Sequence, residues 1–137
     1  MDHPLRILVV DDEIDLVHML RTHLEAEGYQ VITASNGITA LSLLAQDRFD
    51  LLIVDVKMPD MSGLDIVQAA RQVDGHVAII MMTADATVET VIEALRLGAD
   101  DFLVKPFRVN FALLPMVERC LARRGLDYAR PSATGVA

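Results

Sequence analysis

Residues 51–55 read Leu-Leu-Ile-Val-Asp, a continuous apolar run that ends in a carboxylate. A continuous run is typical of a β-strand that is covered on both faces, because a solvent-exposed face would bring in alternating polar residues. Similar apolar runs occupy residues 7–10, 31–33, 77–82 and 102–104. Together the five runs predict five strands of a sheet that is buried on both sides.

Amphipathic helical patterns separate these runs. Apolar residues recur with a period near 3.6 in each interval. The positions are Val17, Leu20 and Leu24; Ile38, Leu41 and Leu44; Ile66, Ala69, Ala70 and Val73; and Val88, Val91, Ile92, Leu95 and Ala99. Gly28 and Gly98 follow two of the patterns, where a C-terminal cap is expected. Alternating strands and helices predict an α/β fold, a parallel sheet with helices on both faces.

The last predicted helix, from Phe111 to Arg124, contains Pro115. With Asn110 as the N-cap, this proline removes a backbone hydrogen bond, so the helix should either start late or kink. We expect a kink. Beyond residue 124 the pattern gives way to Gly, Pro and Ser, which is typical of a linker. We therefore place one domain at residues 4–124 and a linker or C-terminal tail at residues 125–137.

Composition excludes several classes of protein. The net charge of −8 disfavours direct nucleic-acid binding, because an acidic surface repels phosphates. No apolar run approaches the roughly 20 residues that span a bilayer, and the N-terminus lacks the pattern of a secretory signal. A cytoplasmic location is therefore expected. The single Cys120 and the four histidines show no metal-binding spacing.

Polar side chains gather at the carboxyl ends of the predicted strands, where open parallel sheets bind ligands. Asp11 and Asp12 follow the first strand, and Asp55 follows the third. Thr83 ends the fourth strand and Lys105 closes the fifth. Because neighbouring strands lie about 4.8 Å apart, these side chains can converge in one small site.

Three carboxylates at one point repel one another unless a cation compensates them. Oxygen ligands without cysteine or histidine favour Mg²⁺ or Mn²⁺ over Zn²⁺. Such a cation also neutralises an incoming phosphoryl group. Asp55, the lone acid at the end of the central strand, is the candidate nucleophile. Lys105 and the Thr83 hydroxyl can bind phosphoryl oxygens.

These residues resemble the signature of response-regulator receiver domains. The matching segments are Asp11-Asp12, Asp55, residues 58–63, Thr83-Ala84, residues 98–102 and Lys105-Pro106-Phe107. They occur in order over nearly the whole domain. The resemblance implies a flavodoxin-like receiver fold with strand order 2-1-3-4-5. It also implies a switch that receives a phosphoryl group from a histidine kinase or phosphotransfer protein and controls an output domain or partner.

The resemblance also implies a role for each pocket residue. Asp55 would be the phosphoacceptor, and Asp12 with Asp55 would bind Mg²⁺ directly. Asp11 would act through a metal-bound water, and the backbone carbonyl of Lys57 would complete the protein ligands. The protein is then no ordinary enzyme, because it would catalyse only its own aspartyl phosphorylation and dephosphorylation.

The remaining implied roles concern the switch. Thr83 and Lys105 would hold the phosphoryl group, and the Lys105–Pro106 peptide bond would be cis. Phe102 stands at the position of the switch aromatic, where tyrosine is commoner. The surface made by the fourth helix, fifth strand and fifth helix would then bind a second copy or an effector. We also expect Lys57 and Asp85 to tune how fast water reaches the acyl phosphate.

Simpler interpretations exist for each residue. Asp11 and Asp12 could cap the first helix, Lys105 could be a structural counter-ion, and Thr83 and Phe102 could be ordinary strand and core residues. Among other functions, an aspartate-nucleophile phosphohydrolase would need a second aspartate where Lys57 stands. A flavin- or nucleotide-binding module would need a Gly-rich loop after the first strand, and a receiver that is not phosphorylated would not need the full set of pocket residues. The sequence leaves open the kinase, the stimulus, the output and whether the chain is part of a longer regulator.

Overall fold

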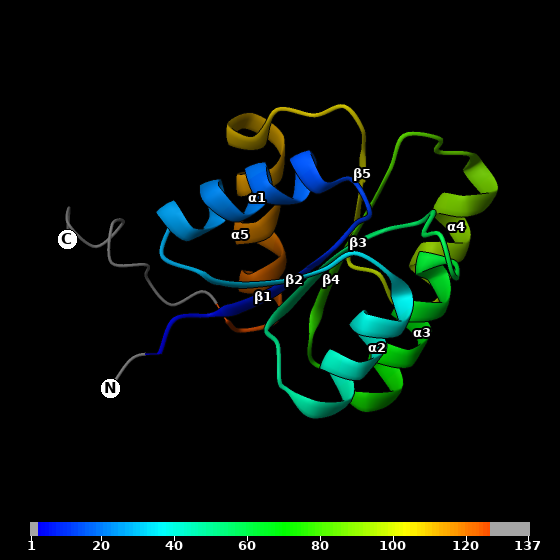
Figure 1. Cartoon of the computed structure of the whole chain (residues 1–137), viewed down its shortest axis with the longest axis horizontal. Helices are drawn as coiled ribbons and strands as arrows, with labels where there is room; N and C mark the ends of the chain where they lie inside the picture. The colour runs from blue at the N-terminus through cyan, green and yellow to red at the C-terminus, as the bar shows by residue number, and fades with distance from the viewer. Residues whose placement is uncertain (1–2, 127–137) are drawn as a thin grey trace.

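In the computed structural model, strands and helices alternate along the described residues, 3–126 (Figure 1). The elements are β1 (Arg6–Val10), α1 (Ile14–Ala26), β2 (Gln30–Ala34), α2 (Gly37–Gln46), β3 (Leu51–Asp55), α3 (Gly63–Val73), β4 (Ala78–Thr83), α4 (Val88–Arg96), β5 (Asp101–Val104), the π-helical turn η1 (Val109–Leu113) and α5 (Leu114–Arg123). All five apolar runs form strands, as predicted.

The five strands form one parallel sheet in the order β2-β1-β3-β4-β5. This confirms the expected order. Helices α1 and α5 lie on one face of the sheet, and α2, α3 and α4 lie on the other (Figure 1). β3 is buried along its whole length, as a central strand covered on both faces must be.

Two separate hydrophobic cores follow from this layering. Successive strand residues point to opposite faces, so Ile7 and Val9 pack towards α1 and α5, whereas Leu8 and Val10 pack towards α2 and α3. Among the described residues, no buried hydrophobic side chain belongs to both cores. The sheet therefore separates two independently packed layers.

Local sequence signals mark the ends of α1 and α4, as expected, and the starts of α2 and α3. Gly28 and Gly98 have positive φ angles of 95° and 111°, and each follows the C-cap residue of its helix, α1 or α4. The Asn36 side chain caps α2 by accepting a hydrogen bond from Thr39 N, and Ser62 caps α3 through Leu64 N.

The last helix differs from the prediction. Residues 109–113 form the wide turn η1, and the regular helix α5 starts only at Leu114. Pro115 thus lies in the first turn, where its missing N–H removes no helical bond. The late start accommodates the proline, so the expected kink was wrong, and Asn110 lies within η1 rather than at an N-cap.

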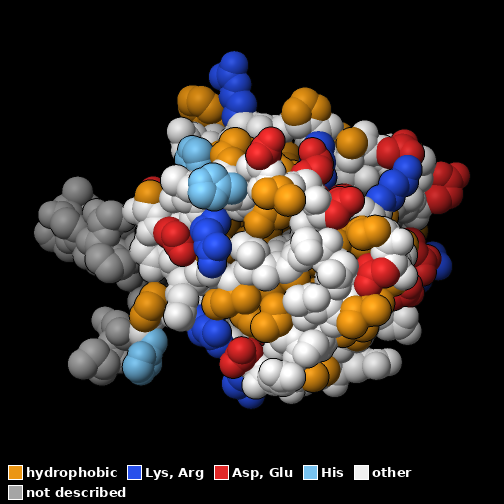
Figure 2. Space-filling view, viewed as in Figure 1, with side chains coloured by type: hydrophobic (Ala, Val, Ile, Leu, Met, Phe, Trp, Pro, Cys, Tyr) orange, Lys and Arg blue, Asp and Glu red, His pale blue; other side chains and the backbone are white. Residues whose placement is uncertain are grey.

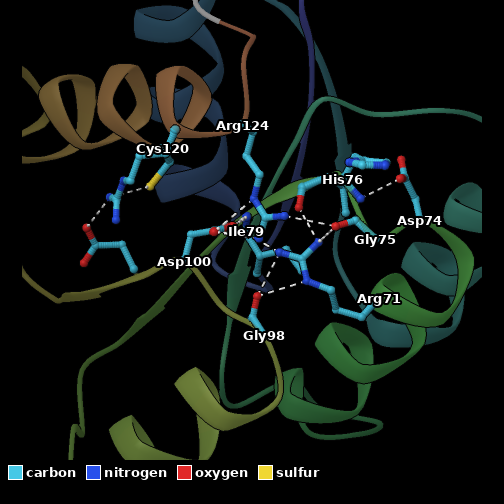
Figure 3. A network of polar contacts seen from close by, with 12 residues as sticks. Arg71, Asp74, Gly75, His76, Ile79, Gly98, Asp100, Cys120 and Arg124 are labelled. Carbon is cyan, nitrogen blue, oxygen red and sulfur yellow. Dashed lines mark hydrogen bonds and ion pairs between the residues drawn. The ribbon is translucent and has the colours of Figure 1, made fainter.

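A polar cluster joins α3, β4, β5 and α5 at the amino ends of the strands (Figure 3). The Asp100 carboxylate, 15% exposed, accepts hydrogen bonds from Arg124 at 2.7 and 3.1 Å, from Arg71 at 3.1 Å and from the Ile79 amide at 2.8 Å. The Arg71 guanidinium also donates to the Gly98 carbonyl at 2.8 and 3.0 Å. We call Arg71, Asp100 and Arg124 the Asp100 cluster.

The described chain ends shortly after α5. Leu126 N donates to the Leu121 carbonyl, and Gly125 has a φ of +74°. Residues 127–137 of the predicted tail lie outside the described residues, so the predicted boundary at residue 124 remains an expectation. Within residues 3–126, every helix is too short or too polar to cross a membrane.

Candidate functional site

The candidate site lies at the carboxyl ends of β1, β3, β4 and β5. Strand register brings these ends to one level, because Asp55 pairs with Met82 and Thr83 pairs with Val104. Asp11, Asp55 and Thr83 are 0%, 6% and 1% exposed, and they are the buried polar side chains of the described chain. Burial of three polar groups at one edge of a sheet requires a compensating partner.

The acids form a cluster of the size that one cation needs. Asp11, Asp12 and Asp55 each offer a carboxylate oxygen, and these oxygens lie within 4.8 Å of one another. Asp11 and Asp55 are buried, whereas Asp12 is exposed. An oxygen-only donor set that opens to solvent on one side fits Mg²⁺, which keeps part of its water shell in proteins.

Lys105 is the ammonium group of this cluster. Its Nζ lies 2.7 Å from Asp11 Oδ2, 3.4 Å from Asp55 Oδ2 and 2.8 Å from Glu13 Oε1. The Lys105–Pro106 peptide bond that follows is cis. One ammonium therefore serves three carboxylates, and Asp12 adds a fourth negative charge beside them.

The pKa shifts of the pocket residues reflect this excess of carboxylates over ammonium groups. Burial raises the pKa of Asp11 and Asp55 above the ordinary value of 3.8, and the Asp11 charge raises that of Asp55 further. Lys105 opposes both shifts. For Lys105 itself, burial disfavours the ammonium, but the hydrogen bonds to Asp11 and Glu13, together with the charges of Asp11 and Asp55, outweigh burial and raise its pKa. The pocket thus retains negative charge that a cation can neutralise.

Neither Asp11 nor Asp12 caps α1. The N-cap of that helix is Glu13, which makes no side-chain cap, while Asp11 Oδ1 accepts a hydrogen bond from Glu13 N at 2.9 Å. The capping interpretation of these two acids was therefore wrong. Glu13 itself was missed by sequence reasoning, although its place directly after the two aspartates was the available signal.

Two exposed residues flank the pocket. Lys57, two positions after Asp55, pairs with Asp85 Oδ2 at 2.9 Å from the neighbouring loop. The backbone of Lys57 also makes a hydrogen bond to Asp55, which favours the ionised carboxylate. The Thr83 hydroxyl accepts a hydrogen bond from Asp85 N at 3.2 Å. The pair thus spans the two loops that border Asp55 and Thr83.

Phe102 lies on β5, away from the acids. It is half-buried and packs against the core on the α2, α3 and α4 side of the sheet. The side chains of Lys57 and Asp85 therefore border the acid cluster, and Phe102 lies outside it. Figure 2 shows many of the visible acidic side chains on the half of the molecule towards which the strands point.

Comparison with known proteins identifies the family. The family model described as the response regulator receiver domain matches residues 7–115. The regulatory protein AtoC of Escherichia coli is 41% identical over 116 residues, which are 85% of this chain and 25% of AtoC. The transcriptional regulatory protein PrrA of Mycobacterium tuberculosis is 37% identical, over 94% of this chain and 55% of PrrA. The chain thus spans about a quarter to a half of these relatives.

Similar solved structures belong to the same family of proteins. A CheY-like receiver domain protein from Methanospirillum hungatei is 29% identical with a TM-score of 0.87, covering 92% of this chain and all of that one. A response regulator of Burkholderia pseudomallei, solved with a phosphorylated aspartic acid and a calcium ion, has 28% identity and a TM-score of 0.79, covering 87% and 69%. The beryllofluoride-activated NtrC4 receiver dimer has 31% identity and a TM-score of 0.82, covering 87% and 98%.

Proposed function

The chain belongs to the response-regulator receiver family, whose domains are phosphorylated on aspartate to control an output, and we propose that Asp55 is its phosphoacceptor. The supporting observation is that Asp55 ends the central strand beside two further acids and the Lys105 ammonium. In the reaction, an Asp55 carboxylate oxygen forms a bond to phosphorus while the bond from phosphorus to the donor's leaving group breaks. A histidine kinase or a phosphotransfer protein would be the donor.

Mg²⁺, or Mn²⁺, is the cofactor that the donor set fits best. Asp12 and Asp55 would hold the ion directly, Asp11 through a bound water, and the Lys57 backbone carbonyl would be a further ligand. When bound, the ion offsets the charge of the acids and of the incoming phosphoryl group. The acid cluster supports this proposal because its oxygens lie within 4.8 Å of one another.

The other pocket residues would bind the transferred group. Lys105 would exchange part of its contact with the acids for a phosphoryl oxygen, since its Nζ is already 3.4 Å from Asp55 Oδ2. The Thr83 hydroxyl would donate to another phosphoryl oxygen. Like other receivers, the chain would catalyse only its own phosphorylation and dephosphorylation, and Lys57 with Asp85 would tune the second step.

The output surface would be α4, β5 and α5. Movement of Thr83 towards the phosphoryl group would let Phe102 turn inward and change this surface. Several apolar side chains lie exposed on α4 and β5, namely Val88, Ile92, Leu95 and Val104, and Phe111 lies exposed on η1 before α5. An apolar surface of this kind suits a protein partner, either a second copy of the chain or an effector. A dimer is a known state of one similar protein, the NtrC4 receiver domain.

The same proposal covers location and output. Receiver domains typically act in the cytoplasm, and the net charge of −8 makes direct nucleic-acid binding by this domain unfavourable. DNA recognition, where the pathway needs it, would be the task of an output domain or partner.

The central test is phosphorylation with a small donor. The protein is incubated with acetyl phosphate and Mg²⁺, then weighed by intact-protein mass spectrometry. The wild type should gain one phosphoryl group, and Asp55→Asn should gain none. Asp101→Asn, an acid outside the pocket, is the matched control and should behave as wild type. A gain that persists in Asp55→Asn, or no gain in the wild type with either Mg²⁺ or Mn²⁺, would overturn the proposal.

A further inference from the structure

The loop between β3 and α3, residues 56–62, is attached to α2 by one carboxylate. Asp60 Oδ1 accepts a hydrogen bond from Gly37 N at 2.8 Å, and Asp60 Oδ2 accepts one from Ile38 N at 2.9 Å. Gly37 and Ile38 are the first two residues of α2. These amides have no partner within the helix, so the carboxylate bridges two elements that are distant in the sequence.

Close packing accompanies the bridge. A Cβ atom on Gly37 would lie 2.3 Å from Met61 Cγ, so Met61 packs directly against the backbone of α2. A Cβ atom on Gly63 would lie 2.0 Å from the carbonyl oxygen of Asp55. Lys57 and Ser62 form a β-bridge that closes the loop on itself. The loop is therefore held in three places: against the Asp55 backbone, against α2, and by the bridge between its two ends, Lys57 and Ser62.

Capping of α2 alone does not require Asp60. The helix has its own N-cap, Asn36, whose side chain accepts a hydrogen bond from Thr39 N at 2.8 Å. Asp60 binds the two preceding amides instead, and these hydrogen bonds hold its pKa below the ordinary value. The carboxylate is thus ionised at neutral pH and sits at the positive end of the α2 dipole.

We propose that Asp60 is a positioning residue for the phosphoacceptor pocket, an inference that rests on the proposed function. By fixing residues 56–62 against α2, Asp60 keeps the Lys57 backbone beside Asp55. That backbone makes a hydrogen bond to the Asp55 carboxylate and carries the carbonyl proposed as a metal ligand. Asp60 touches neither group, so it acts only through the loop.

The test compares two caps of the same helix. Asp60→Ala and Asn36→Ala each remove a side chain that accepts hydrogen bonds at the N-terminus of α2. Both should lower the urea midpoint of unfolding. Only Asp60→Ala should weaken Mg²⁺ binding, by about tenfold or more, the size typical of lost outer-shell support. Isothermal titration calorimetry with MgCl₂ measures the dissociation constant.

A conservative variant keeps the test decisive. Asp60→Asn retains an amide oxygen that can accept one of the two hydrogen bonds, so it should restore part of the Mg²⁺ affinity, and it replaces Asp60→Ala should that variant not fold. Wild-type Mg²⁺ affinity in the folded Asp60 variants would overturn the positioning role while leaving the proposed function intact. A wild-type protein that binds no Mg²⁺ and gains no phosphoryl group would instead overturn the proposed function itself.

Discussion

At the amino ends of the strands Asp100 lies between two guanidinium groups, whereas at the carboxyl ends Asp55 shares one ammonium with two other acids. The Asp100 cluster has more positive than negative groups, and both carboxylate oxygens accept hydrogen bonds. The pocket holds the carboxylates of Asp11, Asp12, Glu13 and Asp55 against Lys105 alone.

The difference separates a structural site from a functional one. A partly buried carboxylate such as that of Asp100, whose two oxygens are both paired, has nothing left to bind, so it fixes the elements around it. A buried carboxylate that is partly paired keeps an affinity for added positive charge, which is the property needed by a cation-dependent phosphoacceptor. The predictions below test this contrast, from the largest expected effect to the smallest.

Removal of the paired carboxylate should cause the largest loss of stability. Asp100→Ala removes the carboxylate that Arg71, Arg124 and the Ile79 amide share. We expect the free energy of unfolding to fall by about 3 kcal/mol, the lower end for a buried pair, because Asp100 is partly exposed and both guanidinium groups keep a backbone acceptor. Urea denaturation followed by circular dichroism measures the change. Asp101→Ala is the control, because its 3.6 Å pair with Arg123 is more exposed and should contribute less than about 1 kcal/mol. Equal losses in the two variants would contradict the contrast.

Mg²⁺ should stabilise the pocket and leave the Asp100 cluster unaffected. At a free concentration of 100 times its dissociation constant, a ligand that binds only the folded state raises the free energy of unfolding by about 2.7 kcal/mol. We expect this rise in the wild type and in Asp100→Ala, and its absence in Asp12→Ala. Denaturation with and without MgCl₂ measures it. A similar rise in Asp12→Ala would place the ion elsewhere.

Neutralising the phosphoacceptor should stabilise the metal-free protein. Asp55→Asn keeps the shape of the side chain but removes its repulsion with Asp11, so we expect a gain of about 1 kcal/mol in EDTA. The same variant should gain nothing from Mg²⁺. Lower stability of Asp55→Asn in EDTA would mean that the hydrogen bonds of the ionised carboxylate outweigh the repulsion.

Stability in EDTA should increase as the pH falls from neutral. The folded-state pKa values of Asp11 and Asp55 lie above their ordinary value of 3.8, so the folded state binds protons more readily than the unfolded state in that interval. The gain is complete below the unfolded value. Asp60 has a lowered pKa, so its contribution is present above its unfolded value and is lost at lower pH.

Melting temperatures between neutral pH and the unfolded-state pKa values measure this trend. The rise should be smaller in Asp55→Asn, which has one fewer titrating group, and Mg²⁺ should suppress it because the metal competes with the protons. A melting temperature that falls throughout this range in EDTA would show that the acids are already compensated.

The smallest effect on stability is expected at the edge of the pocket. Lys57→Ala removes an exposed ion pair with Asp85, so the free energy of unfolding should change by less than about 0.5 kcal/mol. The lifetime of the acyl phosphate should nevertheless change, because Lys57 stands two residues after Asp55 and, as proposed above, would tune how fast water reaches the acyl phosphate. Decay of the phosphorylated protein measures the lifetime, with Arg96→Ala on α4 as the control. An unchanged lifetime would count against the tuning role of Lys57.

The sequence was sufficient to predict the strands of the sheet and the acids that follow them at its edge. Continuous apolar runs such as residues 51–54 predict buried parallel strands, and the residue that follows such a strand must lie at the edge. The strands themselves depend on backbone periodicity, which a single sequence records. The order of the strands came from the resemblance to receiver domains, and β4 lies between β3 and β5, so the contact of Lys105 with Asp55 spans more than one strand spacing.

The contacts that the sequence did not reveal depend on where helices end and where side chains reach. The Asp60 bridge joins residues 22 and 23 positions apart in the chain, and its loop was interpreted only as a turn. Arg71 and Arg124 meet at Asp100 because the last turn of α3 and the end of α5 both lie beside the start of β5, which no local pattern encodes (Figure 3). The start of α5 was misplaced since a π-helical turn has no propensity signal of its own.

The division of the interior into two cores limits how one side of the molecule can influence the other. With no buried apolar side chain common to both layers in residues 3–126, a rearrangement around α1 and α5 cannot spread by repacking into the layer of α2, α3 and α4. Such a rearrangement can reach the other layer only through the strand backbones or around the edge of the sheet. The acids and Lys105 lie at the edge formed by the carboxyl ends of the strands, where the two layers meet. A charge added there is therefore next to both layers.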